Sequence, residues 1–512
     1  MAEQPALLIS ADLIQRGSNL NGRRWAGRTL LETWAAHTGP QPLHLACADP
    51  GLVRELEPII RAAGHTGAIQ AHGLVQPHAY AAIGGLFIPD PSIGRWARWR
   101  RAIGSERFSL IGQIHTLNTP AALAHLEALA SEPIQPWDAL ICTSSAGRDV
   151  VEAVWADRQT QLQQRLGSTA PLPKPTLPVI PLPIPALAMQ QALPERSAAR
   201  QALNLPQDAH VCLWLGRLSL LTKLDPWPTY ALLQRVASEL PRPLWLVECG
   251  PDDTPEQGRH FNVLRQLCPH VQFLRLGGAE PVDEAVKFQA LAAADVALSL
   301  VDNCQETFGL SVIEAMAAGL PVVASDWDGY RDTIRHGIDG FLIPSRWASG
   351  SHACSFPLGW QQQLELQSFP VVAGAMAQLV QLDMAAAQAC LATLLTHPAL
   401  ARAMGRQGRE RAQQRFSGAV VMQQYAALFQ ELADRRLAAP PSALPAAPPL
   451  ALDPCRLFAH FASPSAAWAH APTGSVPEPV LEGRQALWRV LLDHLTPTEQ
   501  TELQPELRGK HL

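Results

Sequence analysis

Short apolar runs alternate with amphipathic stretches along most of the chain, and this alternation predicts the secondary structure. The apolar runs that we interpret as strands cover residues 7–10, 43–47, 109–114, 139–143, 211–215, 244–247, 271–274, 296–300 and 321–324. Strands that are separated by helical stretches favour parallel, doubly wound sheets. The sequence therefore predicts an α/β protein with two such domains, facing each other across a cleft at the carboxyl ends of their strands, where open α/β sheets bind ligands.

Two proline-rich runs, 171–185 and 440–454, divide the chain. The first cannot be helical and is typical of an extended crossover, and the second is typical of a linker. The predicted parts are an α/β domain over 1–190, a second over 200–400, helices over 401–436, the linker over 440–454 and an appendage over 455–512. In the appendage, Trp488 and a set of apolar residues at helical spacing predict an amphipathic helix that docks on the body or on a partner: Val480, Leu487, Val490, Leu491 and Leu495.

Composition narrows the class of protein. The 512 residues are 47% hydrophobic and 17% charged, with a net charge of -5, which argues against a general nucleic-acid binder. No apolar run has the length of a membrane span, and the acidic start lacks the basic region of a secretory signal. The nine cysteines form no C-x-x-C pair, and Cys212, Cys249 and Cys304 lie in apolar surroundings that predict buried thiols. We expect a cytoplasmic protein, with a peripheral contact at the inner face of the membrane left open.

Two carboxylates, Glu306 and Glu314, enclose a segment that predicts a ligand site. Gly309 between them lets the backbone approach a ligand, and a helix that begins there would present free N–H groups to an anion. Carboxylates on both sides can accept hydrogen bonds from sugar or ribose hydroxyls. A phosphate-bearing, polyhydroxyl ligand such as a sugar nucleotide fits this pattern.

The run from Glu306 to Ala324, ETFGLSVIEAMAAGLPVVA, resembles the E-x7-E donor signature of the retaining glycosyltransferases of family 4, the group 1 glycosyl transferases. The resemblance implies the GT-B fold, with two Rossmann-like domains, and the helices of 402–432 resemble the family's C-terminal helices, the last of which packs on the first domain. It also implies a nucleotide-diphosphate sugar as co-substrate, no metal, no cofactor, and an acceptor that the sequence does not identify. In the family's pattern Glu306 orients the sugar hydroxyls and Glu314 those of the ribose, and the donor-binding residues are Gly216, Thr307, Phe308, Gly309, Leu310 and Glu314.

Basic residues at strand ends complete the predicted site. Arg217 follows a strand and Gly216, and Lys223 comes six residues later, as neutralisation of a diphosphate requires. In the family such residues hold the donor diphosphate, although the spacing to Lys223 is one residue longer than the common form. His115 follows a strand of the first domain, where the family has a histidine near the transferred sugar. We predict catalytic roles for His115, Arg217, Lys223 and Glu306.

Other segments have alternative interpretations. The loop of residues 16–22 lacks the family's glycine pair, so its contacts are not assigned. The run 95–101 mixes arginine and tryptophan, which fits a membrane or phosphate contact, but we favour a solvated helix face with the tryptophans packed inward. Asp326, Asp328 and Asp332 are interpreted as ordinary loop carboxylates, and the insertion 347–367 has no assigned role. The alternatives for the whole protein are a sugar-nucleotide epimerase and a non-catalytic sugar-nucleotide-binding protein.

Overall fold

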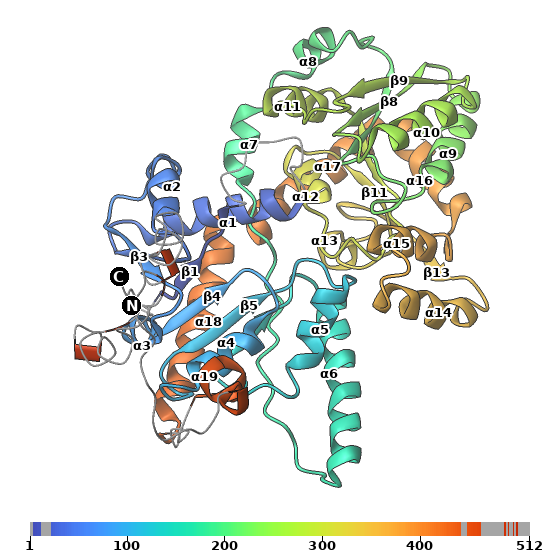
Figure 1. Ribbon diagram of the computed structural model, residues 1–512. Coiled ribbons are helices and arrows are strands. Elements are labelled where there is room, and N and C mark those ends of the chain that lie inside the picture. The colour runs from blue at the N-terminus through green and yellow to red at the C-terminus, as the bar shows by residue number, and fades with distance from the viewer. Residues whose placement is uncertain are drawn as a thin grey trace, which may run out of the picture. The chain divides into compact units, whose positions relative to one another are not determined.

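The computed structural model describes residues 4–11, 22–441 and 448–461, together with a few separate residues further on. It forms two compact units, residues 1–449 and 450–512. The larger unit contains two six-stranded parallel sheets and an antiparallel pair of short strands (Figure 1). The strands are β1 (Ala6–Leu8), β2 (Leu43–Cys47), β3 (Ile69–Gly73), β4 (Gly85–Ile88), β5 (Ser109–Gln113), β6 (Ala139–Ile141), β7 (His210–Leu215), β8 (Leu244–Cys249), β9 (Val271–Leu276), β10 (Val296–Ser299), β11 (Val322–Ser325), β12 (Gly340–Ile343), β13 (Ser345–Trp347) and β14 (Val380–Leu382).

Helices connect the parallel strands in both sheets. Those before the second sheet are α1 (Gly22–Thr38), α2 (Gly51–Ala62), α3 (Pro77–Ile83), α4 (Ile93–Arg100), α5 (Pro120–Ala128), α6 (Ser145–Leu166), α7 (Ala186–Ala192) and α8 (Arg196–Ala202). Those that follow are α9 (Pro226–Glu239), α10 (Pro255–Gln266), α11 (Glu284–Ala293), α12 (Leu310–Ala317), α13 (Tyr330–Thr333), α14 (His352–Gln363), α15 (Phe369–Ala377), α16 (Met384–Thr396), α17 (Pro398–Phe416) and α18 (Gly418–Ala438).

The two sheets have the same topology. Their strand orders are β3-β2-β1-β4-β5-β6 and β12-β11-β10-β7-β8-β9. In each sheet the strand order reverses at one point, between β1 and β4 in the first sheet and between β7 and β10 in the second. The apolar pattern predicted β1, β2 and the strands from β5 to β11. It missed β4, whose four residues are buried in the middle of the first sheet, and the short antiparallel pair β13 and β14. It also missed the edge strands β12 and β3, the latter with half-exposed residues IQAHG. An edge strand carries little apolar pattern because solvent covers one side of it.

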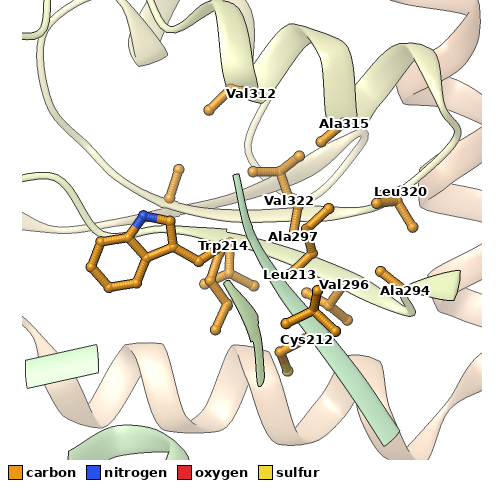
Figure 2. Packing of buried hydrophobic residues seen from close by; sticks show 14 of the residues in the cluster. Cys212, Leu213, Trp214, Ala294, Val296, Ala297, Val312, Ala315, Leu320 and Val322 are labelled. Atoms are coloured by element: carbon orange, nitrogen blue, oxygen red, sulfur yellow. The ribbon is translucent and has the colours of Figure 1, made fainter. Parts of the chain in front are cut away.

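The core of the second sheet lies under α12, the helix that begins at Gly309. Cys212, Leu213 and Trp214 of β7 are buried, as are their neighbours on β10 and β11. Figure 2 shows Val312 and Ala315 of α12 beside this layer. Because α12 is packed on the sheet, its first turn is held at the carboxyl ends of the strands.

Helix α18 returns to the first sheet, and Figure 1 shows it, in orange, beside the blue α1. Its Tyr425 and Phe429 pack on Trp34 of α1 and Phe87 of β4, with the Phe87 and Tyr425 ring centroids 5.6 Å apart. The Gln113 amide nitrogen donates to the Tyr425 hydroxyl at 2.7 Å. The proline-rich run between the sheets is extended and lies along β6, where Leu140 N donates to the carbonyl of Thr176 at 2.9 Å.

The arginine- and tryptophan-rich run 95–101 was predicted to be a solvated helix face with its tryptophans packed inward, and the structure agrees only in part. Trp96 and Trp99 pack together as expected, with ring centroids 5.6 Å apart. Arg100, however, is fully buried, and its guanidinium binds both carboxylate oxygens of Asp138, at 2.6 and 2.8 Å. The prediction was wrong for Arg100 because a buried arginine needs a partner distant in sequence, which no local pattern reveals.

The insertion after β13 and the smaller unit contain none of the residues that were predicted to bind the ligand. The insertion after β13 forms α14, on which Phe356 and Trp360 are exposed. In the smaller unit, Asp453 caps the short helix α19 (Pro454–Leu457), while the predicted amphipathic helix around Trp488 lies largely outside the described residues.

Within the described part of the chain, no single helix is long and apolar enough to cross a membrane. Helices α16 and α17 together have the required length and apolar composition, but the chain bends sharply between them.

Candidate functional site

The predicted site residues gather where the second sheet reverses its strand order. Strands β7 and β10 pair directly, and they lead into different helices. The loop after β7 carries Arg217 and Lys223, and the loop after β10 carries Glu306 and ends at Gly309. Ligands of open α/β sheets bind outside the carboxyl ends of the strands at such a reversal. The topology thus brings together two segments that are about 85 residues apart in the sequence.

Glycines hold the loops at this edge in backbone contact. A Cβ at Gly250, after β8, would lie 2.0 Å from the carbonyl oxygen of Gly216, and a Cβ at Gly277, after β9, would lie 2.3 Å from that of Gly250. Neither position has room for a side chain. The Arg217 loop is therefore fixed against the loop that follows β8.

Gly309 is required by both its conformation and its surroundings. Its φ is 95°, which L side chains rarely adopt, and a Cβ there would lie 2.3 Å from Cε1 of Tyr330. As the N-cap of α12 it receives no side-chain cap hydrogen bond, so the helix start keeps N–H groups available for an anion.

Glu306 and Lys223 form an ion pair at the centre of the site. The Tyr330 hydroxyl also donates to the Glu306 carboxylate, at 3.3 Å, and binds Ser299 Oγ at 2.7 Å. Burial by itself raises the pKa of Glu306, but the charge and hydrogen bond of Lys223, with those from Tyr330 and the Phe308 N–H, outweigh it and hold the pKa below the ordinary value. Glu306 is therefore ionised at neutral pH.

The other predicted charged residues are also paired. Arg217 donates to Asp253 at 2.7 Å, and the second Asp253 oxygen accepts from Ser219 Oγ. Glu314 accepts from Lys287 Nζ at 3.0 Å. Each predicted donor-binding charge thus has an opposite charge beside it, which a bound diphosphate or hydroxyl would have to displace or share.

Lys287 joins the site to the first domain. Its ammonium lies 5.3 Å from the ring centroid of Trp25, at the start of α1. Lys287, Asp253 and Tyr330 were not predicted from the sequence. None of them belongs to a local motif, so they are recognised as site residues only by the side chains that they contact in the folded protein.

Three further contacts connect the first α/β domain to the second. His115 is half-buried, and its backbone carbonyl accepts from Thr307 Oγ1. Asp332 accepts from both Ser145 N and Ser145 Oγ at the start of α6, and Asp328 accepts from Ser144 Oγ at 3.4 Å. Asp328 and Asp332, which we interpreted as loop carboxylates without a metal-binding pattern, thus also form contacts between the domains that the sequence did not predict.

The remaining predicted donor-binding side chains face the protein interior. Phe308 packs on Phe416 of α17, with ring centroids 6.1 Å apart, and Leu310 packs on the core beneath α12. The Phe308 N–H donates to Glu306, so at these two positions the backbone N–H of Leu310 is the group available for a ligand. The atypical loop of residues 16–22 lies outside the described residues except for its last residue.

Asp328 is strained and half-buried beside Glu306. Its φ is 45°, although it is not a glycine. Burial, followed by the charge of Glu306, raises its pKa to about 7. Between its ordinary value of 3.8 and about 7, the folded chain holds a proton that the unfolded chain has released, so this residue makes stability fall as the pH rises through that window.

We expect Asp328→Asn to flatten this pH dependence. The amide cannot ionise, so the melting temperature should fall less than that of the wild type between about pH 4 and pH 7. The slope does not vanish, because burial also raises the pKa of Asp302 to about 7. Melting curves at several pH values test this, with the more exposed Asp326→Asn as the control. Equal slopes for Asp328→Asn and the wild type would contradict the assignment.

Comparisons with known proteins place the second domain in context. Residues 209–353 match the model of the glycosyl transferases group 1. The chain is 25% identical over 292 residues to a D-inositol 3-phosphate glycosyltransferase of Thermobispora bispora, covering 56% of this chain and 64% of that protein, less than two thirds of its length. It is 25% identical over 311 residues to a phosphatidyl-myo-inositol mannosyltransferase of Mycobacterium tuberculosis, covering 57% and 77%.

Among solved structures, HepE of Anabaena in complex with UDP is similar, with a TM-score of 0.50 and 16% identity over 84% of this chain and all of the other. This likeness, with the two parallel sheets, confirms the two-domain, Rossmann-like GT-B fold. The match over 209–353 confirms the resemblance to the group 1 glycosyl transferases that the run from Glu306 to Ala324 indicated.

Proposed function

We propose that this protein is a glycosyltransferase that moves a sugar from a nucleotide-diphosphate donor to an acceptor, with retention of the anomeric configuration. The observation that carries the proposal is the Glu306–Lys223 pair, set beside the helix start at Gly309 where the second sheet reverses. The match to group 1 glycosyl transferases and the likeness to glycosyltransferase relatives support it. A UDP sugar is the first donor to test, because the similar Anabaena structure contains UDP.

The proposed chemistry follows from charge. Cleavage of the bond to the anomeric carbon leaves negative charge on the diphosphate, and Arg217, Lys223 and the N–H groups after Gly309 stabilise it there. Glu306, held ionised, accepts hydrogen bonds from the sugar hydroxyls, and Glu314 accepts those of the ribose. His115 lies on the opposite domain, where its own backbone carbonyl accepts from Thr307 Oγ1, and we propose that its side chain helps to hold the sugar from that side. This scheme needs no metal and no cofactor, and we propose that it operates in the cytoplasm.

A thermal-shift assay tests the proposal. A ligand that binds only the native protein raises its melting temperature. We expect one of UDP, GDP, ADP and CMP to raise it selectively, and the rise to persist with EDTA. A well-folded sample that responds to none of them would contradict the proposal.

Arg217→Ala should weaken nucleoside diphosphate binding. A charge-assisted hydrogen bond contributes about 1.5–3 kcal/mol, so we expect Kd to rise by about 10- to 100-fold. Isothermal titration with the diphosphate identified above measures this. The control is Arg235→Ala, an exposed arginine on α9. An unchanged Kd for Arg217→Ala would remove Arg217 from the site.

The two alternatives make different predictions. An epimerase would convert the donor sugar with no acceptor present, and a binding protein would bind the donor without turnover under any acceptor. The comparisons favour neither, because the relatives reported above are named as transferases. Analysis of the donor by chromatography, with and without candidate acceptors, separates the three.

A further inference from the structure

Two adjacent residues after β10, Asp302 and Asn303, lie between the two segments that carry the central ion pair. Both are buried, Asp302 with 5% of its surface exposed and Asn303 with none. Neither belongs to the motif from Glu306 onward, and neither has a role in the scheme above. Buried polar side chains are costly unless their hydrogen bonds are made, so their partners show what they do.

Asn303 binds the Lys223 loop with one end of its amide and the Glu306 turn with the other. Its Nδ2 donates to the carbonyl of Leu221 at 2.9 Å, two residues before Lys223. Its Oδ1 accepts from Gln305 N at 2.9 Å, one residue before Glu306. The backbone carbonyl of Asn303 also accepts from Glu306 N, at 3.3 Å.

Asp302 holds the other side of the Lys223 loop. Both of its carboxylate oxygens lie within hydrogen-bond distance of Asp225 N, at 3.3 and 3.2 Å, two residues after Lys223. The backbone is thus held on both sides of Lys223, by two residues that are joined covalently and that lead directly to Glu306.

We propose that Asp302 and Asn303 are positioning residues that set the distance between the Lys223 ammonium and the Glu306 carboxylate. The inference rests on the proposed function, because it takes these two charges as the groups that contact the donor. A transferase needs the cation at the diphosphate and the carboxylate at the sugar, on either side of the bond that breaks. Both are on loops, and loops hold such geometry only when buried hydrogen bonds fix them.

Lysine reactivity measures this positioning without a ligand. The chain has only four lysines, Lys174, Lys223, Lys287 and Lys510. Acetic anhydride acylates an amine more slowly when the amine is held in an ion pair. In Asn303→Ala we expect Lys223 to be acetylated several-fold faster than in the wild type, relative to Lys287, which pairs with Glu314. Peptide mass spectrometry gives the rate at each site.

A pair of variants at Asp302 separates positioning from a general structural effect. Asp302→Asn keeps an acceptor oxygen for Asp225 N and should leave the Lys223 rate near that of the wild type, whereas Asp302→Ala should raise it. Asn262→Ala, on the exposed face of α10, is the control for Asn303→Ala. If Asn303→Ala does not fold, the two Asp302 variants decide.

Binding and turnover complete the experiment. With UDP and GDP as probes, and with the sugar nucleotide of whichever binds, we expect kcat of Asn303→Ala to fall by about 10- to 100-fold, with a smaller change in the Kd of the diphosphate. Lys223 acetylated at the wild-type rate in folded Asn303→Ala and Asp302→Ala proteins would overturn the inference. If the wild type bound neither probe, the proposed function would fail separately, since the acetylation rates need no ligand.

Discussion

Glu306→Gln should reduce turnover by about 10²- to 10³-fold while the protein remains folded. The carboxylate pairs with Lys223 and accepts from Tyr330, and these contacts keep it ionised. The amide has nearly the same shape but no charge, so it accepts more weakly from sugar hydroxyls and leaves the Lys223 ammonium without its counterion. The measurement is kcat and KM with the donor identified by thermal shift.

The matched control is Glu410→Gln, an exposed glutamate on α17 far from the motif in sequence. It changes the net charge equally and should retain wild-type turnover. Circular dichroism and melting curves for both variants establish that they are folded. Wild-type kcat in Glu306→Gln would remove this residue from the reaction.

Asp138→Ala should destabilise the protein by about 3–5 kcal/mol, because it leaves the guanidinium of Arg100 buried and unpaired. Besides binding Arg100, the carboxylate accepts from Leu110 N at 2.9 Å and from Gln135 N at 2.8 Å. Domains are commonly stable by only 5–15 kcal/mol, so this is a large loss. Urea unfolding compares the variant with the wild type.

An exposed ion pair provides the contrast. Glu57→Ala removes the partner of Arg61 on the surface of α2 and should cost no more than about 1 kcal/mol. Replacing both members of the buried pair, as Arg100→Met with Asp138→Leu, should recover much of the loss, since no unpaired charge then remains. Similar losses for Asp138→Ala and Glu57→Ala would show that burial of Arg100 is not what makes the pair important.

The local pattern of the sequence determined most of the fold. Most buried central strands are continuous apolar runs, and the start of α12 is set by Gly309, so these strands and this helix start could be predicted from neighbouring residues. The run from Glu306 to Ala324 could be recognised because a helix start with free N–H groups is built from consecutive residues, so the whole pattern lies in one segment of the chain. For the same reason Glu306 and Lys223 could each be predicted as a site residue, from the segment in which it lies.

Only the tertiary structure decided which charges meet. The pairing of Lys223 with Glu306, of Lys287 with Glu314 and of Arg100 with Asp138 depends on the order of strands and on burial. Asp328 shows the limit of the sequence most clearly. It resembles any loop aspartate until burial beside Glu306 raises its pKa and Ser144 of the other domain approaches it. Electrostatic interactions act through space, and the chain neighbours of a residue do not record what the fold will place beside it.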